Sequence, residues 1–248
     1  MRRYQILGLC FAALLLSAVN VSARALVQGP VTIQATTENA SASWTLNFDQ
    51  YVDENDQWAY SINDPIDLVS NGNVLGSISA LSLDVKGDPV VDLGFTVMAG
   101  NEDTQFTIIS TVLNFDPIPN AVGYATAGMT LTSNRNASSS MTGAFDGKCY
   151  RAIYNGDKVF ANLVDSFSAP PRGSNASDER YPLQESTWAT LSDTPISMQS
   201  VFSFKLTPWK LASGTSTFEV QAVPEPGSLT LAICAVPALV CFARRRRK

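Results

Sequence analysis

Apolar residues stand at every second position through long stretches of this chain. Successive side chains of a β-strand point to opposite faces, so this alternation predicts strands with one buried and one solvated face. The alternating runs are Trp44, Leu46, Phe48; Leu81, Leu83, Val85; Val91, Leu93, Phe95, Val97; Ile109, Thr111, Leu113, Phe115; Ala125, Ala127, Met129, Leu131; Ile196, Met198, Ser200, Phe202, Phe204, Leu206; and Phe218, Val220, Ala222. No helical apolar repeat is sustained between residues 26 and 223. We therefore expect residues 26–222 to form a single two-sheet antiparallel β-sandwich of jelly-roll-like topology.

Clusters of Gly, Asn, Asp and Pro separate these runs and predict the turns. They are KGDP at residues 86–89, AGNED at residues 99–103, and YNGDK, in which Asn155-Gly156 predicts a hairpin. Two stretches lack the alternation, and we expect both to be irregular: residues 48–65, and residues 166–182, where the Pro170-Pro171 pair predicts a long surface loop.

The first 25 residues have the order of a secretory signal peptide. Arg2 and Arg3 precede an apolar run over residues 6–19, and Ala23 and Ala25 supply small residues at a cleavage site. A run of this length is shorter than the roughly 20 residues of a membrane-spanning helix, which is the alternative reading. We expect residues 1–25 to form a signal helix that is removed on export.

The last 26 residues combine three features in series. Val223, Pro224, Glu225 and Pro226 precede an uncharged stretch over residues 229–243, and a basic cluster ends the chain. As a helix, the uncharged stretch is about 22 Å long, which is a short transmembrane helix. The basic cluster comprises Arg244, Arg245, Arg246, Arg247 and Lys248 and is expected to stop transfer on the cytoplasmic side.

This arrangement resembles the PEP-CTERM sorting signal of exported bacterial proteins, and the resemblance is confined to residues 223–248. It implies that an exosortase-type enzyme recognises the tripeptide at Pro224, Glu225 and Pro226 and removes the helix and basic tail. Two alternatives are a permanent single-span anchor and a eukaryotic lipid-anchor signal, although the latter normally ends in its apolar stretch. The expected location is the cell surface or the extracellular space, after transient anchoring in the inner membrane.

Composition excludes several classes of activity and partner. The chain contains no histidine, which excludes Ser-His-Asp and Cys-His nucleophiles and histidine-ligated zinc. Residues 26–223 hold nine Lys and Arg against 21 Asp and Glu, a net charge of −12, so nucleic acid is not an expected partner. Cys149 is the one cysteine of the predicted domain, and we expect a packed thiol.

Candidate ligands of a cation gather in one short stretch, which we call the acidic segment: Asp49, Asp53, Asn55 and Asp56. Calcium takes six to eight oxygen ligands of this kind. The spacing of an EF-hand loop is absent, since no Gly and no Glu stand at its sixth and twelfth positions. A calcium site and a solvated acidic loop are both consistent with the segment; no other cofactor is expected.

Aromatic and acidic residues raise the question of carbohydrate. Trp58 with Tyr60, or Trp188, can stack on a sugar ring, although large aromatics in a sandwich are mainly core residues. Asp178, Glu179 or Glu185 could each supply one carboxylate of a glycosidase, but no same-face pair is evident.

We therefore expect an exported protein of the cell surface or extracellular matrix, noncatalytic, with a structural or adhesive role and extracellular polysaccharide as a partner. The alternatives are a secreted carbohydrate-active hydrolase with paired carboxylates and a calcium-dependent glycan-binding module.

Overall fold

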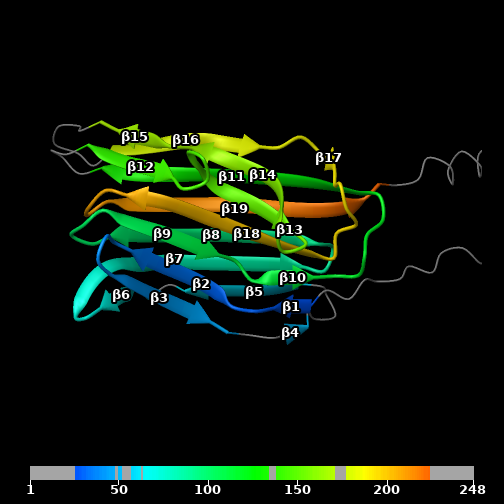
Figure 1. Ribbon diagram of the computed structural model, residues 1–248, viewed down its shortest axis with the longest axis horizontal. Coiled ribbons are helices and arrows are strands. Elements are labelled where there is room, and N and C mark those ends of the chain that lie inside the picture. Colours follow the sequence, from blue (N-terminus) through cyan, green and yellow to red (C-terminus); the bar gives the residue numbers. More distant parts are fainter. Residues whose placement is uncertain are drawn as a thin grey trace, which may run out of the picture.

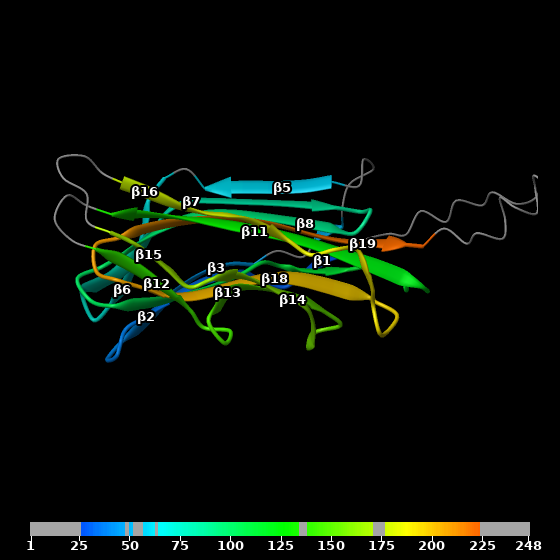
Figure 2. The same ribbon diagram turned by 90° about the horizontal axis from the view of Figure 1, so that it is seen from above.

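Two antiparallel sheets pack face to face in the computed structural model, which describes residues 26–47, 50–51, 57–62, 64–133, 138–170 and 177–223 (Figures 1 and 2). We call the 11-stranded sheet A and the 8-stranded sheet B. Sheet A contains β1 (Leu26–Gln28), β2 (Val31–Thr36), β3 (Ser41–Leu46), β4 (Gln50–Tyr51), β9 (Thr104–Ile109), β10 (Val112–Asn114), β12 (Ser139–Gly143), β13 (Lys148–Tyr154), β14 (Lys158–Asp165), β15 (Phe167–Ala169) and β18 (Ser197–Leu206). Sheet B contains β5 (Gln57–Ile62), β6 (Ile66–Ser70), β7 (Asn73–Lys86), β8 (Val90–Ala99), β11 (Ala121–Ser133), β16 (Ser177–Glu185), β17 (Ala189–Thr190) and β19 (Leu211–Ala222). The expected two-sheet antiparallel sandwich is confirmed.

The core between the sheets is built around aromatic rings. Phe95 of sheet B meets Phe202 of sheet A edge to face, with ring centroids 4.9 Å apart, and the ring of Tyr150, which pairs with Phe202 within sheet A, lies 4.8 Å from it between centroids. Phe106 and Phe204 extend the cluster and are fully buried. Burying each such side chain contributes about 1.5–3 kcal/mol, so these contacts between the layers stabilise the sandwich.

The longest alternating runs lie where the sequence predicts. Leu83 on β7, Leu93 on β8 and Leu131 on β11 all point into the core with their alternate neighbours. The hairpins at residues 87–89 and 155–157 are confirmed, and Asn155 and Gly156 both adopt positive φ. AGNED instead carries the chain from sheet B to sheet A, because β8 and β9 belong to different sheets.

The predicted run from Ile109 to Phe115 is wrong as one strand. β9 buries Phe106 and Ile108 and leaves Ile109 half-buried, so the inward face is the opposite one. The strand breaks at Ser110, whose hydroxyl accepts the N–H of Ser200 at 2.9 Å, and pairing resumes at β10. At this point the chain is held to β18 by two bonds with Ser200, because the Ser110 N–H also donates to the Ser200 carbonyl at 2.9 Å.

Both stretches expected to be irregular contain strands. Residues 57–62 form β5, the edge strand of sheet B, and residues 177–185 form β16 at its other edge. The predicted loop at residues 166–182 also includes β15. These segments do not strictly alternate apolar and polar residues. They form strands because their backbones pair with β7, β11 and β12.

Both ends of the described chain lie at one end of the sandwich. β1 and the last part of β19 are on the right in Figure 1, and the N–H of Val223 donates to the carbonyl of Asn120. The β6–β7 hairpin and the β18–β19 turn lie at the opposite end. Among the described residues, no helix has the length and apolar character needed to cross a membrane.

Candidate functional site

The face of sheet B that points away from sheet A is polar, and it is arranged as rows across neighbouring strands. Because alternate residues share a face, the strand register fixes which side chains stand side by side. One row reads Thr126, Thr217, Asp92, Asp84, Ala59, from β11 across β19, β8 and β7 to β5. The next row reads Gly128, Thr215, Gly94, Ser82, Ser61. Hydroxyls and carboxylates therefore stand side by side at seven of the ten positions of these rows, and Ala59, Gly94 and Gly128 occupy the others.

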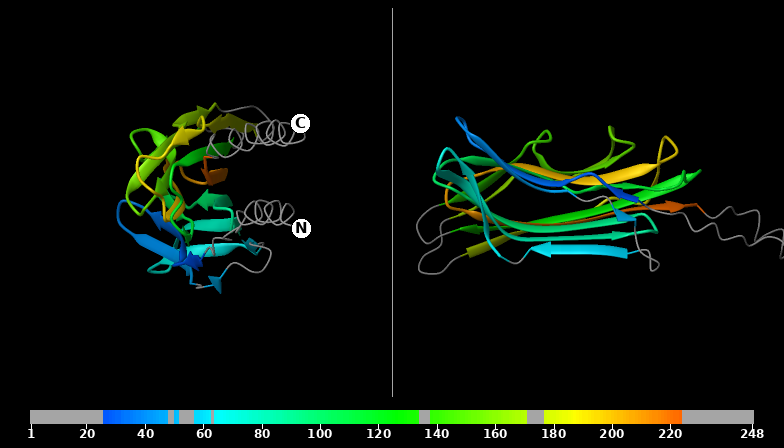
Figure 3. Two further views of the ribbon diagram at one scale, coloured as in Figure 1. Left: turned by 90° about the vertical axis from the view of Figure 1, so that its right-hand side faces the viewer. Right: turned by 90° about the horizontal axis from the view of Figure 1, so that it is seen from below.

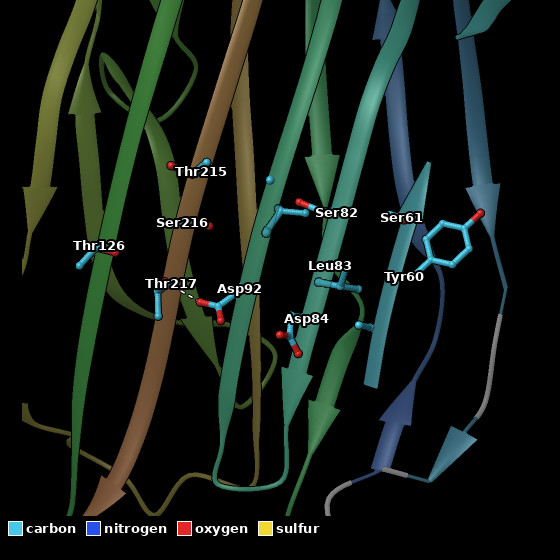
Figure 4. Close-up of a pocket in the computed structure, with 13 residues that line it drawn as sticks. Tyr60, Ser61, Ser82, Leu83, Asp84, Asp92, Thr126, Thr215, Ser216 and Thr217 are labelled. Carbon is cyan, nitrogen blue, oxygen red and sulfur yellow. Dashed lines mark hydrogen bonds between the residues drawn. The ribbon is translucent and has the colours of Figure 1, made fainter. Parts of the chain in front are cut away.

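These two rows line a hollow of about 610 Å³, which we call the outer groove (Figure 4). Gly94 deepens it, because a Cβ at that position would lie 2.5 Å from the Ser82 hydroxyl. The edge strands β5 and β16 stand farther from sheet A than the central strands do, so the face is concave (Figures 2 and 3). The groove is open to solvent along the sheet.

Asp84 and Asp92 form a directly opposed pair within the outer groove. Gln57 Nε2 donates to Asp84 Oδ2 at 2.8 Å, and Thr217 Oγ1 donates to Asp92 Oδ1 at 2.5 Å. Lys86 Nζ lies 3.7 Å from Asp92 Oδ2, and both side chains are partly exposed, so this ion pair contributes little. Like charges directly opposite each other oppose pairing of the strands, so the fold tolerates an unfavourable contact here.

Asp84 also has spare hydrogen-bonding capacity. Its Oδ1 atom is buried and accepts no hydrogen bond from the described residues. A carboxylate oxygen is an acceptor only, and leaving one buried and unpaired is costly.

An aromatic pair lies on the same face towards the chain ends. Trp188 stacks on Tyr124, with ring centroids 5.1 Å apart and planes 21° from parallel, and 46% of Trp188 is exposed. Tyr124 stands two residues before Thr126 on β11, so the stack lies one row beyond the outer groove. By contrast, Trp58 and Tyr60 stack on each other and pack against the core, as expected for large aromatic residues of a sandwich.

Most site residues proposed from the sequence lie outside the described residues. These are Asp49, Asp53, Asn55, Asp56, Pro224, Glu225, Pro226, Arg244, Arg245, Arg246 and Arg247. Val223 is exposed at the end of β19. Within the described ranges, no group of three or more Cys, Asp and Glu residues is placed to hold a metal ion.

The carboxylates considered for catalysis are spread along β16. Along the ladder with β11, Asp178 pairs in register with Thr132, Glu179 with Leu131 and Glu185 with Thr126. The pair that the fold does bring together, Asp84 and Asp92, was missed. Its signal is the KGDP turn: both residues lie four positions from Asp88, so a hairpin there sets them opposite each other.

Cys149 is fully buried on β13, which confirms the packed thiol. Burial, together with the negative charge of Asp165, raises the pKa of this thiol to about 12. The thiolate is the nucleophilic form of cysteine, so Cys149 is inert at neutral pH.

No protein-family model matches this chain, and no curated protein sequence matches it. One structural match is described as "Structure of infectious bursal disease virus Gx strain", at 11% sequence identity and a TM-score of 0.23. The match covers 85% of this chain and 60% of the viral chain. A TM-score this low supports no inference about fold or function.

Proposed function

We propose that this protein is an exported, noncatalytic component of the cell surface or extracellular matrix, and that its outer groove binds extracellular polysaccharide. The observation that carries the proposal is the row Thr126, Thr217, Asp92, Asp84 on the concave face of sheet B. Ser and Thr hydroxyls both donate and accept hydrogen bonds, and carboxylates accept them. Sugar hydroxyls have the complementary capacity, and the open groove admits a polymer without requiring a chain end.

Charge favours a neutral glycan over an acidic one. The net charge of −12 over residues 26–223 repels polyanions over distances of about a Debye length, roughly 8 Å at physiological salt. In the outer groove the two carboxylates would face the ligand directly. A neutral polysaccharide avoids this repulsion and can still donate its hydroxyls to Asp84 and Asp92.

The proposed location at the cell surface or in the extracellular space rests on the two terminal segments of the chain. Residues 1–25 serve as the signal peptide, and residues 223–248 as a PEP-CTERM-like sorting signal with a short transmembrane helix, read by an exosortase-type enzyme. The domain between them has jelly-roll-like topology in this proposal. β1 and the end of β19 lie at the same end of the sandwich, an arrangement that allows attachment at that end and leaves the other end free.

A carbohydrate-active hydrolase is the second candidate, because one observation favours it. Cβ atoms of directly opposed residues lie about 4.5–5.5 Å apart, a spacing that can place two carboxyl groups at the roughly 5–5.5 Å of retaining glycosidases. Asp84 and Asp92 are such a pair. We prefer binding, because both carboxylates already accept side-chain hydrogen bonds and act as fixed acceptors.

Affinity electrophoresis of the full-length chain tests both candidates, in a detergent whose head group is not a sugar. Gels would contain a soluble β-glucan, a polyuronate or no polymer. We expect retardation by the β-glucan, weakened at least tenfold in the Asp84→Asn/Asp92→Asn double variant. Asp103→Asn is the matched charge control, because Asp103 pairs with Lys205 on the opposite sheet.

Two results would go against this proposal. Equal migration of the native protein in all gels would reject glycan binding. Release of reducing sugar that disappears with Asp84→Asn would establish the hydrolase instead.

A further inference from the structure

The turn between β18 and β19 holds a tryptophan in a backbone conformation that disfavours it. Trp209 follows Pro208 and has φ +59°, in the left-handed region that normally takes Gly or Asn, because a Cβ there crowds the following carbonyl. Burial does not compensate, since 59% of Trp209 is exposed. A bulky residue kept in such a position points to a role for its side chain.

The fold holds this turn in place from both sides. The N–H of Trp209 donates to the carbonyl of Gly100 at 2.9 Å, and the N–H of Ala99 donates to the carbonyl of Lys210 at 2.9 Å. The turn is therefore fixed to the end of β8. The indole is presented on a rigid base, which lowers the entropic cost of binding a ligand on it.

A pocket of about 320 Å³ lies beside the indole. Trp209, Met98 and Val74 supply its large apolar side chains, and all three are exposed. Asp67, Asn73 and Asn101 supply an acceptor carboxylate and two amides that both donate and accept. An aromatic surface bordered by a few polar groups is the usual composition of a small-ligand site.

We propose that this pocket is a second saccharide-binding subsite. The indole of Trp209 takes the apolar face of a sugar ring, while Asp67, Asn73 and Asn101 bind its hydroxyls. The polar partners fit a neutral polyol better than an apolar peptide segment, which would leave them desolvated and unpaired. Asp67 is the one charged residue among those that line the pocket, so the pocket offers a metal ion only a single carboxylate and suits a neutral ligand better.

The inference rests on the proposed function and extends it along the same face. Met98 stands on β8 six residues beyond Asp92, on the same side of the strand, so the pocket begins about 20 Å from the carboxylate pair. The pocket is lined from the β6–β7 hairpin and the β18–β19 turn, which lie at the end of the sandwich opposite β1. One polysaccharide chain running along β8 would contact the outer groove and then the indole at the free end.

The test uses Trp209→Gly, because glycine accepts the left-handed conformation without strain. In the β-glucan gel, the affinity of Trp209→Gly should fall at least tenfold, whereas its thermal midpoint should stay the same or rise. Trp209→Phe keeps a ring and should stay within about threefold of the native affinity. Ile196→Ala is the control, because Ile196 is a similarly exposed apolar residue near the other end.

The outcomes separate the two proposals. If the native chain is not retarded, the proposed function fails and this inference fails with it. A second outcome is that the native chain and Trp209→Gly are retarded equally, whereas the Asp84→Asn/Asp92→Asn variant is not retarded. In that case the outer groove binds glycan, and the pocket beside Trp209 is not a subsite. Loss of binding only together with a lowered thermal midpoint would make Trp209 a structural residue and overturn the inference.

Discussion

Alkaline pH should destabilise this fold through a tyrosine buried between the sheets. Tyr150 on β13 has no exposed surface, and its hydroxyl lies 3.0 Å from the hydroxyl of Ser200. Burial raises the pKa of Tyr150 from 10.0 to about 12, because the phenolate would lose its hydration. Replacing Tyr150 with Phe removes the ionisable group and leaves the ring in the core.

The loss of stability at alkaline pH follows from the linkage between proton binding and folding. The unfolded chain releases the phenol proton near pH 10, whereas the folded chain holds it to about pH 12, so the stabilising contribution is complete below pH 10 and is lost as pH rises to 12. Two pKa units correspond to about 3 kcal/mol. The Cys149 thiol, whose pKa burial raises from 9.0 to about 12, adds a similar loss that begins nearer pH 9.

Urea unfolding followed by tryptophan fluorescence measures this directly across the alkaline range. Near neutral pH, Tyr150→Phe should be about 1 kcal/mol less stable than the native protein, since it loses the hydrogen bond to Ser200. Above about pH 11 the order should reverse, because only the chain that carries Tyr150 gains free energy from releasing the phenol proton when it unfolds. Parallel stability curves for the two proteins at all pH values would refute the reasoning.

Three further predictions concern packing, reactivity and metal. Gly214→Ala should cost about 1–3 kcal/mol, because its Cβ would lie 2.5 Å from the buried Phe95 ring, whereas Gly94→Ala meets only the rotatable Ser82 hydroxyl and should cost less; equal urea midpoints would contradict this. Cys149 should resist a thiol reagent at neutral pH until the chain unfolds, and rapid labelling of the peptide that contains Cys149 in the native protein would show an accessible thiol. The acidic segment should behave as a solvated loop, with one thermal midpoint in EGTA, calcium and magnesium; a calcium-specific rise would instead identify a bound ion.

The fold could be predicted wherever one strand face alternates strictly. Leu83 and Leu131 mark strands of sheet B because each lies between polar residues on the opposite face, and Leu93 does so with Asp92 and Gly94 beside it. β5 and β16 have no such alternation, because they are edge strands that are held in place by hydrogen bonds to β7 and β11. The prediction failed at Ile196, which alternates with core residues but is exposed just before β18 begins.

The candidate site was harder to predict because it depends on register between strands. Asp84 and Thr217 are far apart in the sequence, and only the pairing of β7, β8 and β19 sets them in one row. The KGDP turn contained enough information to place Asp84 opposite Asp92. The left-handed backbone conformation of Trp209 could not be predicted from the sequence, because a Pro-Trp pair does not indicate a positive φ.

Backbone amide chemical shifts of the protein, recorded with and without a soluble neutral β-glucan oligosaccharide, test the central claim most directly. The account predicts that saturable changes concentrate on the outer face of sheet B, at Ser82 and Asp84, at Asp92 and Gly94, and at Thr215 and Thr217. Changes confined to sheet A, or no changes at saturating oligosaccharide, would contradict glycan binding in the outer groove.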